Sequence, residues 1–306
     1  MAGQYNLEEK EMDMSQAKWE RIAILASALA LAGLFLGTSV VRAGENKGKI
    51  SLSAGVDFPT AYFFRGILQE DEDFIAQPYL ETTINLYEAS EALNSVSATL
   101  GIWNSFHAGP TGGSGTNNDP RIWYEADLYG GLTFGLFEDW EAGVTYTAYT
   151  SPNGAFTTVQ EIAFSLSFDD SDLLGAFALS PTVLVAIEID EQADGGTDEG
   201  VYLELGIEPG FTVIESKDYP VSLAFPVTLG LSLDDYYQDS SGDDDTFGYL
   251  DAGIVASMPL GFIPADYGSV KVFAGVHFLV LGDNLEAVNT GDDFEAIGTF
   301  GISLAY

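Results

Sequence analysis

The last eight residues, Thr299-Phe300-Gly301-Ile302-Ser303-Leu304-Ala305-Tyr306, alternate between apolar side chains and polar or small ones and end on an aromatic residue. Such alternation is typical of a β-strand with one apolar face. A strand at the end of a chain leaves an open edge that attracts other strands unless it is paired. We therefore expect this strand to pair with the first strand of the domain and so to close a barrel.

The same residues resemble the C-terminal signal by which bacterial outer-membrane proteins are recognised for insertion, with matching positions at Gly301, Leu304 and Tyr306. A closed barrel is one of only two structures that cross lipid with every backbone polar group hydrogen-bonded. The resemblance implies outer-membrane lipid and the barrel-assembly machinery as partners. The alternative is the last strand of a soluble β-sandwich.

Composition favours one large barrel over two small domains. The chain has 306 residues, 46% of them hydrophobic, with 34 glycines and no cysteine, so disulfide bonds and thiolate metal sites are excluded. Its net charge of −37 argues against binding to nucleic acid or to anionic lipid surfaces and favours cations as partners.

The longest apolar run, residues 22–37, follows Lys18 and Arg21 and precedes the small residue Ala43. This order of a basic segment, an apolar segment and small residues is that of a signal peptide. We predict a signal peptide at residues 1–43 and an outer-membrane β-barrel at residues 44–306. A permanent helical anchor is the alternative, although the run is shorter than the roughly 20 apolar residues that a spanning helix needs.

From Lys49 onward, period-two alternation recurs without convincing helical periodicity. This predicts an all-β fold, a transmembrane antiparallel up-and-down β-barrel of about twelve strands, with ten or fourteen as alternatives. Long Gly- and Asp-rich connections fall mostly at one end and short turns at the other, as in outer-membrane barrels. The expected strands are 50–66, 74–88, 95–107, 121–136, 140–150, 156–168, 173–190, 199–213, 220–235, 247–258, 268–282 and 293–306. The connection 67–73 is expected outside.

Alternate residues of each strand should point to lipid and to the lumen. Carboxylates facing lipid would be costly, so the charged residues of the strands should face inward. The expected lumen-facing, pore-lining set is Asp57, Arg65, Glu81, Glu125, Asp127, Glu141, Glu161, Glu188, Glu204, Glu208, Asp251, Lys271 and Glu295. Within it we expect Asp57 or Glu81 to hold Arg65. A lumen lined by carboxylates would favour cations.

Two further features of the predicted strands concern proline and aromatic residues. Pro59, Pro181, Pro209 and Pro226 lie inside them, where proline removes a ladder hydrogen bond, so bulges or strand ends must accommodate them. Aromatic groups such as Tyr236-Tyr237 fall near strand ends, where the aromatic girdles of a membrane interface would lie.

Three segments carry a family resemblance: Tyr62-Phe63-Phe64-Arg65-Gly66-Ile67, Gln77-Pro78-Tyr79 and Leu100-Gly101-Ile102-Trp103-Asn104-Ser105. Together they resemble the TorF-like outer-membrane porin family of Gram-negative bacteria. The resemblance covers the first part of the barrel and the C-terminal signal. It implies an outer-membrane barrel with a pore and no established catalytic residue. The acidic residues 70–73 depart from the family pattern.

We therefore predict a porin-like channel of the bacterial outer membrane for passive diffusion of small solutes, with a preference for cations and without enzymatic activity or cofactor. One alternative is a non-conducting structural or surface-interaction barrel. Another is an outer-membrane lipase or deacylase, for which Ser105 and His107 are the only candidate pair. Clustered Asp243, Asp244 and Asp245 are weak candidates for Ca²⁺, which prefers oxygen ligands. The sequence leaves the oligomeric state open.

Overall fold

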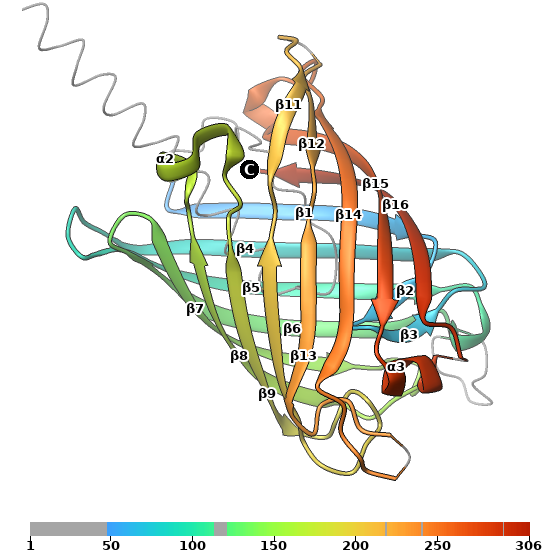
Figure 1. The fold of residues 1–306 in the computed structure, drawn as a ribbon. Helices are drawn as coiled ribbons and strands as arrows, with labels where there is room; N and C mark the ends of the chain where they lie inside the picture. The colour runs from blue at the N-terminus through green and yellow to red at the C-terminus, as the bar shows by residue number, and fades with distance from the viewer. Residues whose placement is uncertain (1–47, 113–120, 218, 240, 290) are drawn as a thin grey trace, which may run out of the picture.

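The computed structural model describes residues 48–306 except 113–120, 218, 240 and 290, and the expected signal peptide lies outside them. The described chain forms an antiparallel β-barrel (Figure 1). Its strands are β1 (Ile50–Pro59), β2 (Tyr62–Phe64), β3 (Ile67–Glu70), β4 (Ile75–Glu88), β5 (Leu93–His107), β6 (Trp123–Leu136), β7 (Trp140–Thr150), β8 (Val159–Phe168), β9 (Thr182–Asp190), β10 (Val201–Ile207), β11 (Gly210–Ile214), β12 (Val221–Ala224), β13 (Val227–Asp234), β14 (Phe247–Pro259), β15 (Ser269–Leu281) and β16 (Phe294–Ala305). The helices are η1 (Pro110–Gly112), α2 (Ser171–Leu174), η2 (Gly175–Phe177), η3 (Ala265–Tyr267) and α3 (Asp283–Val288).

The barrel has twelve crossings within the described residues, because β10 with β11 and β12 with β13 each make a single interrupted crossing. Each strand of the wall pairs with its neighbours in an antiparallel sense, and β16 pairs with β1. The predicted fold and strand number are confirmed. We call the end that holds the start of β1 and the end of β16 the periplasmic end, as in other outer-membrane barrels.

The closing seam lies between the first and last strands, as the C-terminal sequence predicts. Asp57 faces Gly301, and the backbones of Leu52 and Tyr306 exchange two hydrogen bonds of 2.7 and 2.8 Å. A Cβ atom on Gly301 would come within 2.6 Å of both the Phe273 ring and the Asp57 carboxylate. Glycine at this position therefore leaves room for two large side chains beside the seam.

Three of the four prolines lie at strand ends or breaks, and the fourth precedes a strand. Pro59 is the last residue of β1, and Pro181 precedes β9. Pro209 separates β10 from β11, and Pro226 separates β12 from β13. The interruptions adjoin, since Phe225 N–H donates to the Pro209 carbonyl over 2.8 Å. Proline lacks the N–H that would continue the ladder, so Pro209 and Pro226 interrupt two neighbouring crossings at the same height in the barrel.

Two predicted segments differ from the structure. Residues 173–181 are not strand, because the chain after β8 forms α2 and η2 before β9 begins at Thr182. The strand predicted at 50–66 ends at Pro59, and residues 62–70 form the separate hairpin β2–β3. The connection expected outside the barrel at 67–73 therefore begins within this hairpin.

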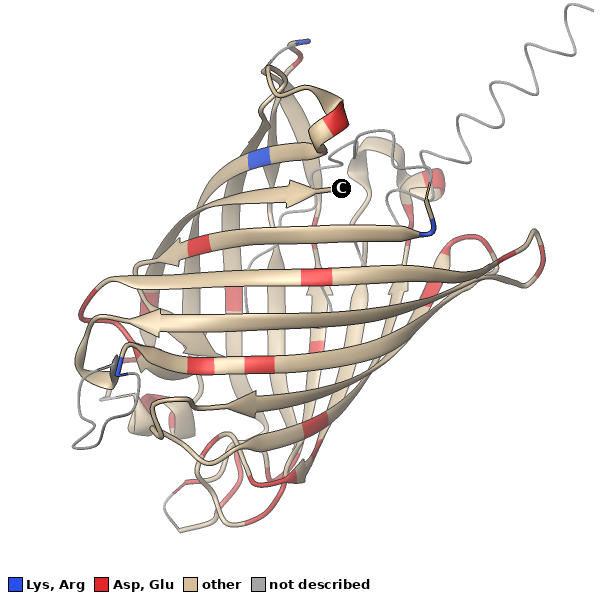
Figure 2. Ribbon diagram, turned by 180° about the vertical axis from the view of Figure 1, so that it is seen from behind, with Lys and Arg blue, Asp and Glu red and all other residues tan. Residues whose placement is uncertain are grey.

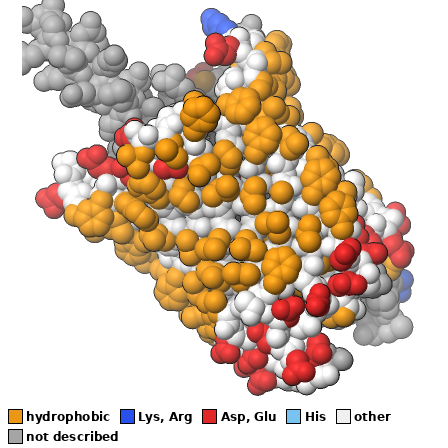
Figure 3. Space-filling model, viewed as in Figure 1, with side chains coloured by type: hydrophobic (Ala, Val, Ile, Leu, Met, Phe, Trp, Pro, Cys, Tyr) orange, Lys and Arg blue, Asp and Glu red, His pale blue; other side chains and the backbone are white. Residues whose placement is uncertain are grey.

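The outer surface of the wall is apolar. Leu80, Leu100, Leu128, Phe164 and Phe300 are each 46 to 67% exposed. Figure 3 shows hydrophobic side chains covering the strands, while acidic side chains gather at the end that holds α3. No described helix is both long and apolar enough to span a bilayer. A closed barrel with an apolar outer surface is the architecture of the bacterial outer membrane, and this protein is located there.

Candidate functional site in the barrel lumen

The hairpin β2–β3 folds into the lumen. Tyr62, Phe63 and Arg65 are only 1, 7 and 5% exposed. Arg65 (φ 48°) and Gly66 (φ 85°) form the two-residue turn, and positive φ at both positions is typical of a type I′ hairpin turn. Glycine suits the second position, whereas arginine in a left-handed conformation is uncommon. The turn thus projects Arg65 at the tip of the hairpin.

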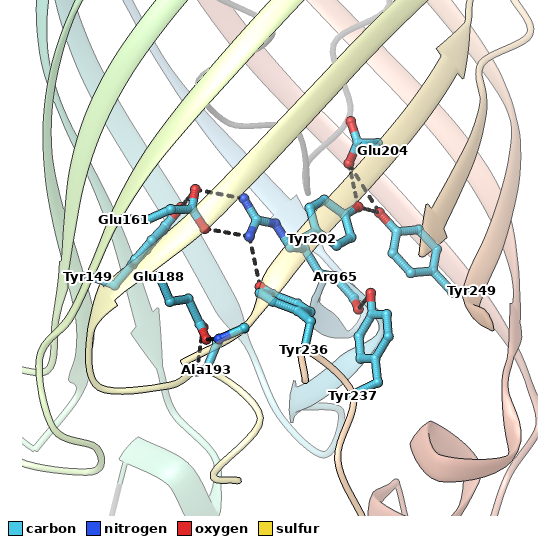
Figure 4. Close-up of polar contacts among 11 residues, drawn as sticks. Arg65, Tyr149, Glu161, Glu188, Ala193, Tyr202, Glu204, Tyr236, Tyr237 and Tyr249 are labelled. Carbon is cyan, nitrogen blue, oxygen red and sulfur yellow. Dashed lines mark hydrogen bonds and ion pairs between the residues drawn. The ribbon is translucent and has the colours of Figure 1, made fainter. Parts of the chain in front are cut away.

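Arg65 reaches the far wall of the barrel and binds Glu161 of β8 (Figure 4). Its Nη1 donates to Glu161 Oε2 over 2.6 Å, and its Nη2 donates to Glu161 Oε1 over 2.9 Å. Nη1 also donates to the Tyr236 hydroxyl over 2.7 Å. The guanidinium carbon lies 4.2 Å from the centre of the Tyr202 ring. The cation is therefore bound along its edge by a carboxylate and on its face by an aromatic ring.

Two further carboxylates flank this ion pair. Glu188 accepts backbone N–H bonds of 2.8 Å from Ala193 and Gly200. Glu204 accepts from the Tyr202 hydroxyl over 2.7 Å and from the Tyr249 hydroxyl over 3.3 Å. Three carboxylates thus surround the single guanidinium group of Arg65, and all three are 5% exposed or less.

The hairpin backbone is fixed separately from the Arg65 side chain. The Tyr237 hydroxyl donates to the Arg65 carbonyl over 3.0 Å. Asn289, which follows α3, donates to the Gly66 carbonyl over 2.6 Å and accepts from the Leu68 N–H over 2.8 Å. Segments more than 170 positions apart in the sequence therefore meet at the turn.

On the other side, the hairpin contacts β5, β6 and the loop between them. The Tyr62 hydroxyl donates to Glu125 over 2.8 Å, and the Tyr124 hydroxyl donates to Gln69. Tyr62 also packs against Trp103, with ring centres 5.5 Å apart. The hairpin therefore contacts opposite walls of the barrel at this level.

Ser105 and His107 face the lumen beside the hairpin. Ser105 Oγ lies 2.7 Å from His107 Nε2, and His107 Nδ1 lies 2.7 Å from the Thr111 hydroxyl. Thr111 donates its hydroxyl hydrogen to Glu70 over 2.5 Å, so it accepts from Nδ1–H and leaves Nε2 to accept from Ser105. Both Ser105 and His107 are 0% exposed. This chain of hydrogen bonds fastens β3 to β5.

Glu70 ends the hairpin strand and does not belong to a membrane crossing. Burial raises the pKa of its carboxyl, but hydrogen bonds from the Thr111 hydroxyl and from the N–H groups of Glu72 and Thr111 outweigh this effect. The net result is a pKa below the ordinary value. The carboxylate is therefore the form that holds the hairpin.

The structure places the predicted lumenal residues at several levels of the barrel, as Figure 2 also shows for the acidic residues along the strands. Lys271 is half-buried near Asp57 and Glu208, towards the periplasmic end. Asp251 Oδ1 lies 2.7 Å from His277 Nδ1. Glu295 is half-buried in β16. The members that are 6% exposed or less are Asp57, Arg65, Glu81, Glu125, Asp127, Glu141, Glu161, Glu188 and Glu204.

Some contacts differ from those expected from the sequence. Arg65 pairs with Glu161 and not with Asp57 or Glu81, because the chain leaves the wall after Pro59 and carries Arg65 across the lumen. Tyr236 and Tyr237 are each 1% exposed in the interior and do not belong to an interfacial girdle. The sequence offers one signal for this inward position, namely that the two tyrosines stand next to each other at the start of an acidic loop.

The described residues of the acidic loop between β13 and β14 are held by hydrogen bonds within the loop and to these two strands. Asp244 accepts from the Ser232 hydroxyl over 2.9 Å and from the Tyr237 N–H over 3.0 Å. Asp245 accepts from Phe247 N–H, and the Asp243 N–H donates to Asp239. In the described part of the chain, no three metal-binding side chains are arranged to hold an ion. A calcium role for Asp243, Asp244 and Asp245 stays a prediction.

Similarity of the chain to known proteins is distant. No family model matches the chain, and none of the curated proteins matches it in sequence. Among solved structures, it is similar to the NanC porin, with 11% identity over 83% of this chain and 98% of the other at a TM-score of 0.44. An outer-membrane channel from Pseudomonas putida F1 shares 9% identity over 89% and 100% (TM-score 0.44), and LpxR from Salmonella typhimurium shares 8% over 83% and 99% (TM-score 0.44). Likeness at this level supports no conclusion about activity.

Proposed function

We propose that the protein is a porin-like outer-membrane channel for passive diffusion of small solutes that prefers cations and is closed here by the β2–β3 hairpin. The observation that supports this proposal is the charge of the lumen. Eight of the predicted lumenal carboxylates are 6% exposed or less, and the nearby cations are Arg65 and Lys271. Burying so many carboxylates is costly for a purely structural barrel but useful in a lumen that admits cations.

Closure follows from the burial of the hairpin. Its tip packs among buried tyrosines, with Tyr202 and Tyr236 at 0 and 1% exposure, and this packing supports closure at this level. Conduction would require the hairpin to move, and its main fastening to the far wall is the Arg65 to Glu161 ion pair. Residues 60–61 and 71–74 would then act as the connections about which it swings.

The proposal includes the finer points that the sequence suggests. The chain would be a TorF-like porin without catalytic residues or cofactor, matured by loss of residues 1–43. Gly301, Leu304 and Tyr306 would be read by the barrel-assembly machinery. Ser105 is buried under the hairpin and faces the lumen, so lipid outside the barrel does not reach it. An absence of labelling by a fluorophosphonate probe would agree with this position.

Planar-bilayer recordings test the channel. The purified barrel, first checked for heat-modifiable migration on a gel, would be placed between KCl solutions of different concentration. We expect low or intermittent conductance from the wild-type protein and a reversal potential of the sign for K⁺ preference. Preference for Cl⁻ would contradict the role of the lumenal carboxylates. A lack of conductance in both the wild type and a variant without Arg65 would favour the non-conducting barrel.

A further inference from the structure

We propose that the pocket around the Arg65 side chain is a binding site for the guanidinium group of a solute, and that Arg65 occupies it as an internal substitute. This inference deepens the proposed function and rests on it in one respect, namely that the solute would reach the pocket through the lumen. Its binding test, however, is independent of conduction.

The walls of the pocket belong to the barrel and not to the hairpin. Glu161 lies on β8, Tyr202 on β10, and Tyr236 just after β13. Among the groups close to the guanidinium, only Phe64, whose ring centre is 5.1 Å from the Arg65 Cζ atom, comes from the hairpin. The arrangement in Figure 4 would therefore persist after the hairpin leaves, with Arg65 itself removed.

The pattern of hydrogen-bond acceptors in the pocket matches a planar cation. Glu161 receives two parallel N–H bonds, the Tyr236 hydroxyl receives a third, and the Tyr202 ring covers one face at 4.2 Å. A guanidinium group provides such parallel donors and a stacking plane, whereas an ammonium group is a compact point charge. The pocket should therefore prefer guanidinium to ammonium and to metal cations.

The charge of the site leaves an attraction for a cation when Arg65 is absent. Glu161, Glu188 and Glu204 are all buried around it, and Arg65 is the guanidinium that they share. Arg65 is tethered and so has a high effective concentration in the pocket, which an external solute must overcome. The left-handed backbone of Arg65 (φ 48°) works against the tethered occupant, because such conformations are unfavourable for residues other than glycine.

The test uses the full barrel carrying Arg65→Ala, which empties the pocket. Its thermal unfolding would be followed by heat-modifiable migration in millimolar guanidinium chloride, with equal concentrations of methylammonium chloride, tetramethylammonium chloride and NaCl as comparisons. We expect guanidinium to raise the midpoint at concentrations about tenfold lower than methylammonium needs, and tetramethylammonium chloride and NaCl to leave it unchanged. Equal stabilisation by all four salts would overturn the proposal.

Two variants complete this test. Adding Glu161→Gln to Arg65→Ala should abolish the guanidinium effect, while adding Glu191→Gln in an exposed loop should preserve it. Guanidinium stabilisation that survives Glu161→Gln would place the binding elsewhere and overturn the assignment.

Because Arg65→Ala could fail to fold, wild-type protein provides a second measurement. Guanidinium chloride, raised to the highest concentration at which the barrel still shows its folded gel migration, should compete with Arg65 and speed hydrogen exchange at residues 63–69, and NaCl at the same concentration should not. Equal exchange in the two salts would overturn the proposal. If guanidinium binds Arg65→Ala but neither protein conducts, the pocket stands and the channel function fails.

Discussion

Arg65 and Lys271 are two basic side chains in the same acidic lumen, yet their surroundings differ. Arg65 is 5% exposed and is held by a two-point ion pair, a tyrosine hydroxyl and an aromatic ring. Lys271 is half-buried on the wall strand β15, with Asp57 and Glu208 near it. Arg65 therefore holds the hairpin, which stands apart from the wall, in one position, whereas Lys271 adjusts the charge of a stretch of the wall itself.

The comparison separates two ways of controlling a pore. A planar, two-point contact has a defined geometry and can hold a hairpin against a wall, whereas a single point charge acts mainly through its field. The region around Arg65 should therefore decide whether the lumen is open. The region around Lys271 should affect only which ions enter.

Arg65→Ala should give the largest effect. It removes one partner of a buried ion pair and leaves Glu161 without its cation, a change that typically costs about 3–5 kcal/mol. We expect a lower urea midpoint for barrel unfolding and a higher single-channel conductance. Arg121→Ala, which removes a positive charge from an exposed loop, is the control and should change neither. Unchanged conductance in Arg65→Ala would show that the hairpin is not the closure.

Asn289→Ala should give the next largest effect. Its side chain satisfies the Gly66 carbonyl and the Leu68 N–H, and each buried group left unsatisfied costs about 1–3 kcal/mol. Hydrogen exchange at residues 66–69 should accelerate while exchange in the wall strands stays the same. Val288→Ala, an exposed change in the same segment, provides the comparison. Uniform acceleration over the whole barrel would mean that Asn289 stabilises the wall and not the hairpin.

Lys271→Gln should have a smaller and different effect. Loss of a positive charge near Asp57 and Glu208 leaves the wall more negative, so the reversal potential in a KCl gradient should move further towards that of K⁺. The frequency and size of openings should not change. Lys217→Gln, at an exposed position near the periplasmic turn, should leave selectivity as it is. A shift towards Cl⁻ would refute the role given to the lumenal charges.

The same contrast explains what the sequence could predict. Lys271 belongs to a regular strand, and the alternation of apolar and polar residues assigns it to the lumenal face. The pairing of the last strand with the first, beside Gly301, was likewise predictable, because a terminal strand needs a partner. Period-two alternation depends only on residues near each other in the sequence, so local sequence is enough to predict the strands of the barrel wall and the face to which each residue points.

The position of Arg65 depends on distant contacts that no local pattern encodes. Alternation continues past Pro59, so the segment reads as one strand, although proline removes the donor that would continue the ladder. The contacts with Glu161, Tyr236 and Asn289 span 96 to 223 positions. Gly66, a residue suited to the second position of a tight turn, was the local indication of a hairpin.

The smallest expected effect concerns pH and the other side of the hairpin. The pKa of Glu70 lies below its ordinary value of 4.5, so the charged form is favoured in the folded state. Its contribution is therefore present at neutral pH and is lost as the pH falls below about 4.5 towards the lowered pKa. We expect acid to increase channel openings in the wild type.

Glu70→Gln should remove this acid response, because its side chain does not titrate. Thr111→Val should weaken it, since the hydroxyl that favours the Glu70 carboxylate is lost. Both variants should open slightly more than the wild type at neutral pH, and far less than Arg65→Ala, because the ion pair on the far wall is intact. Bilayer recordings between pH 7 and about 3.5 provide the measurement. An acid response that persists in Glu70→Gln would assign the titration to carboxylates of the wall and not to Glu70.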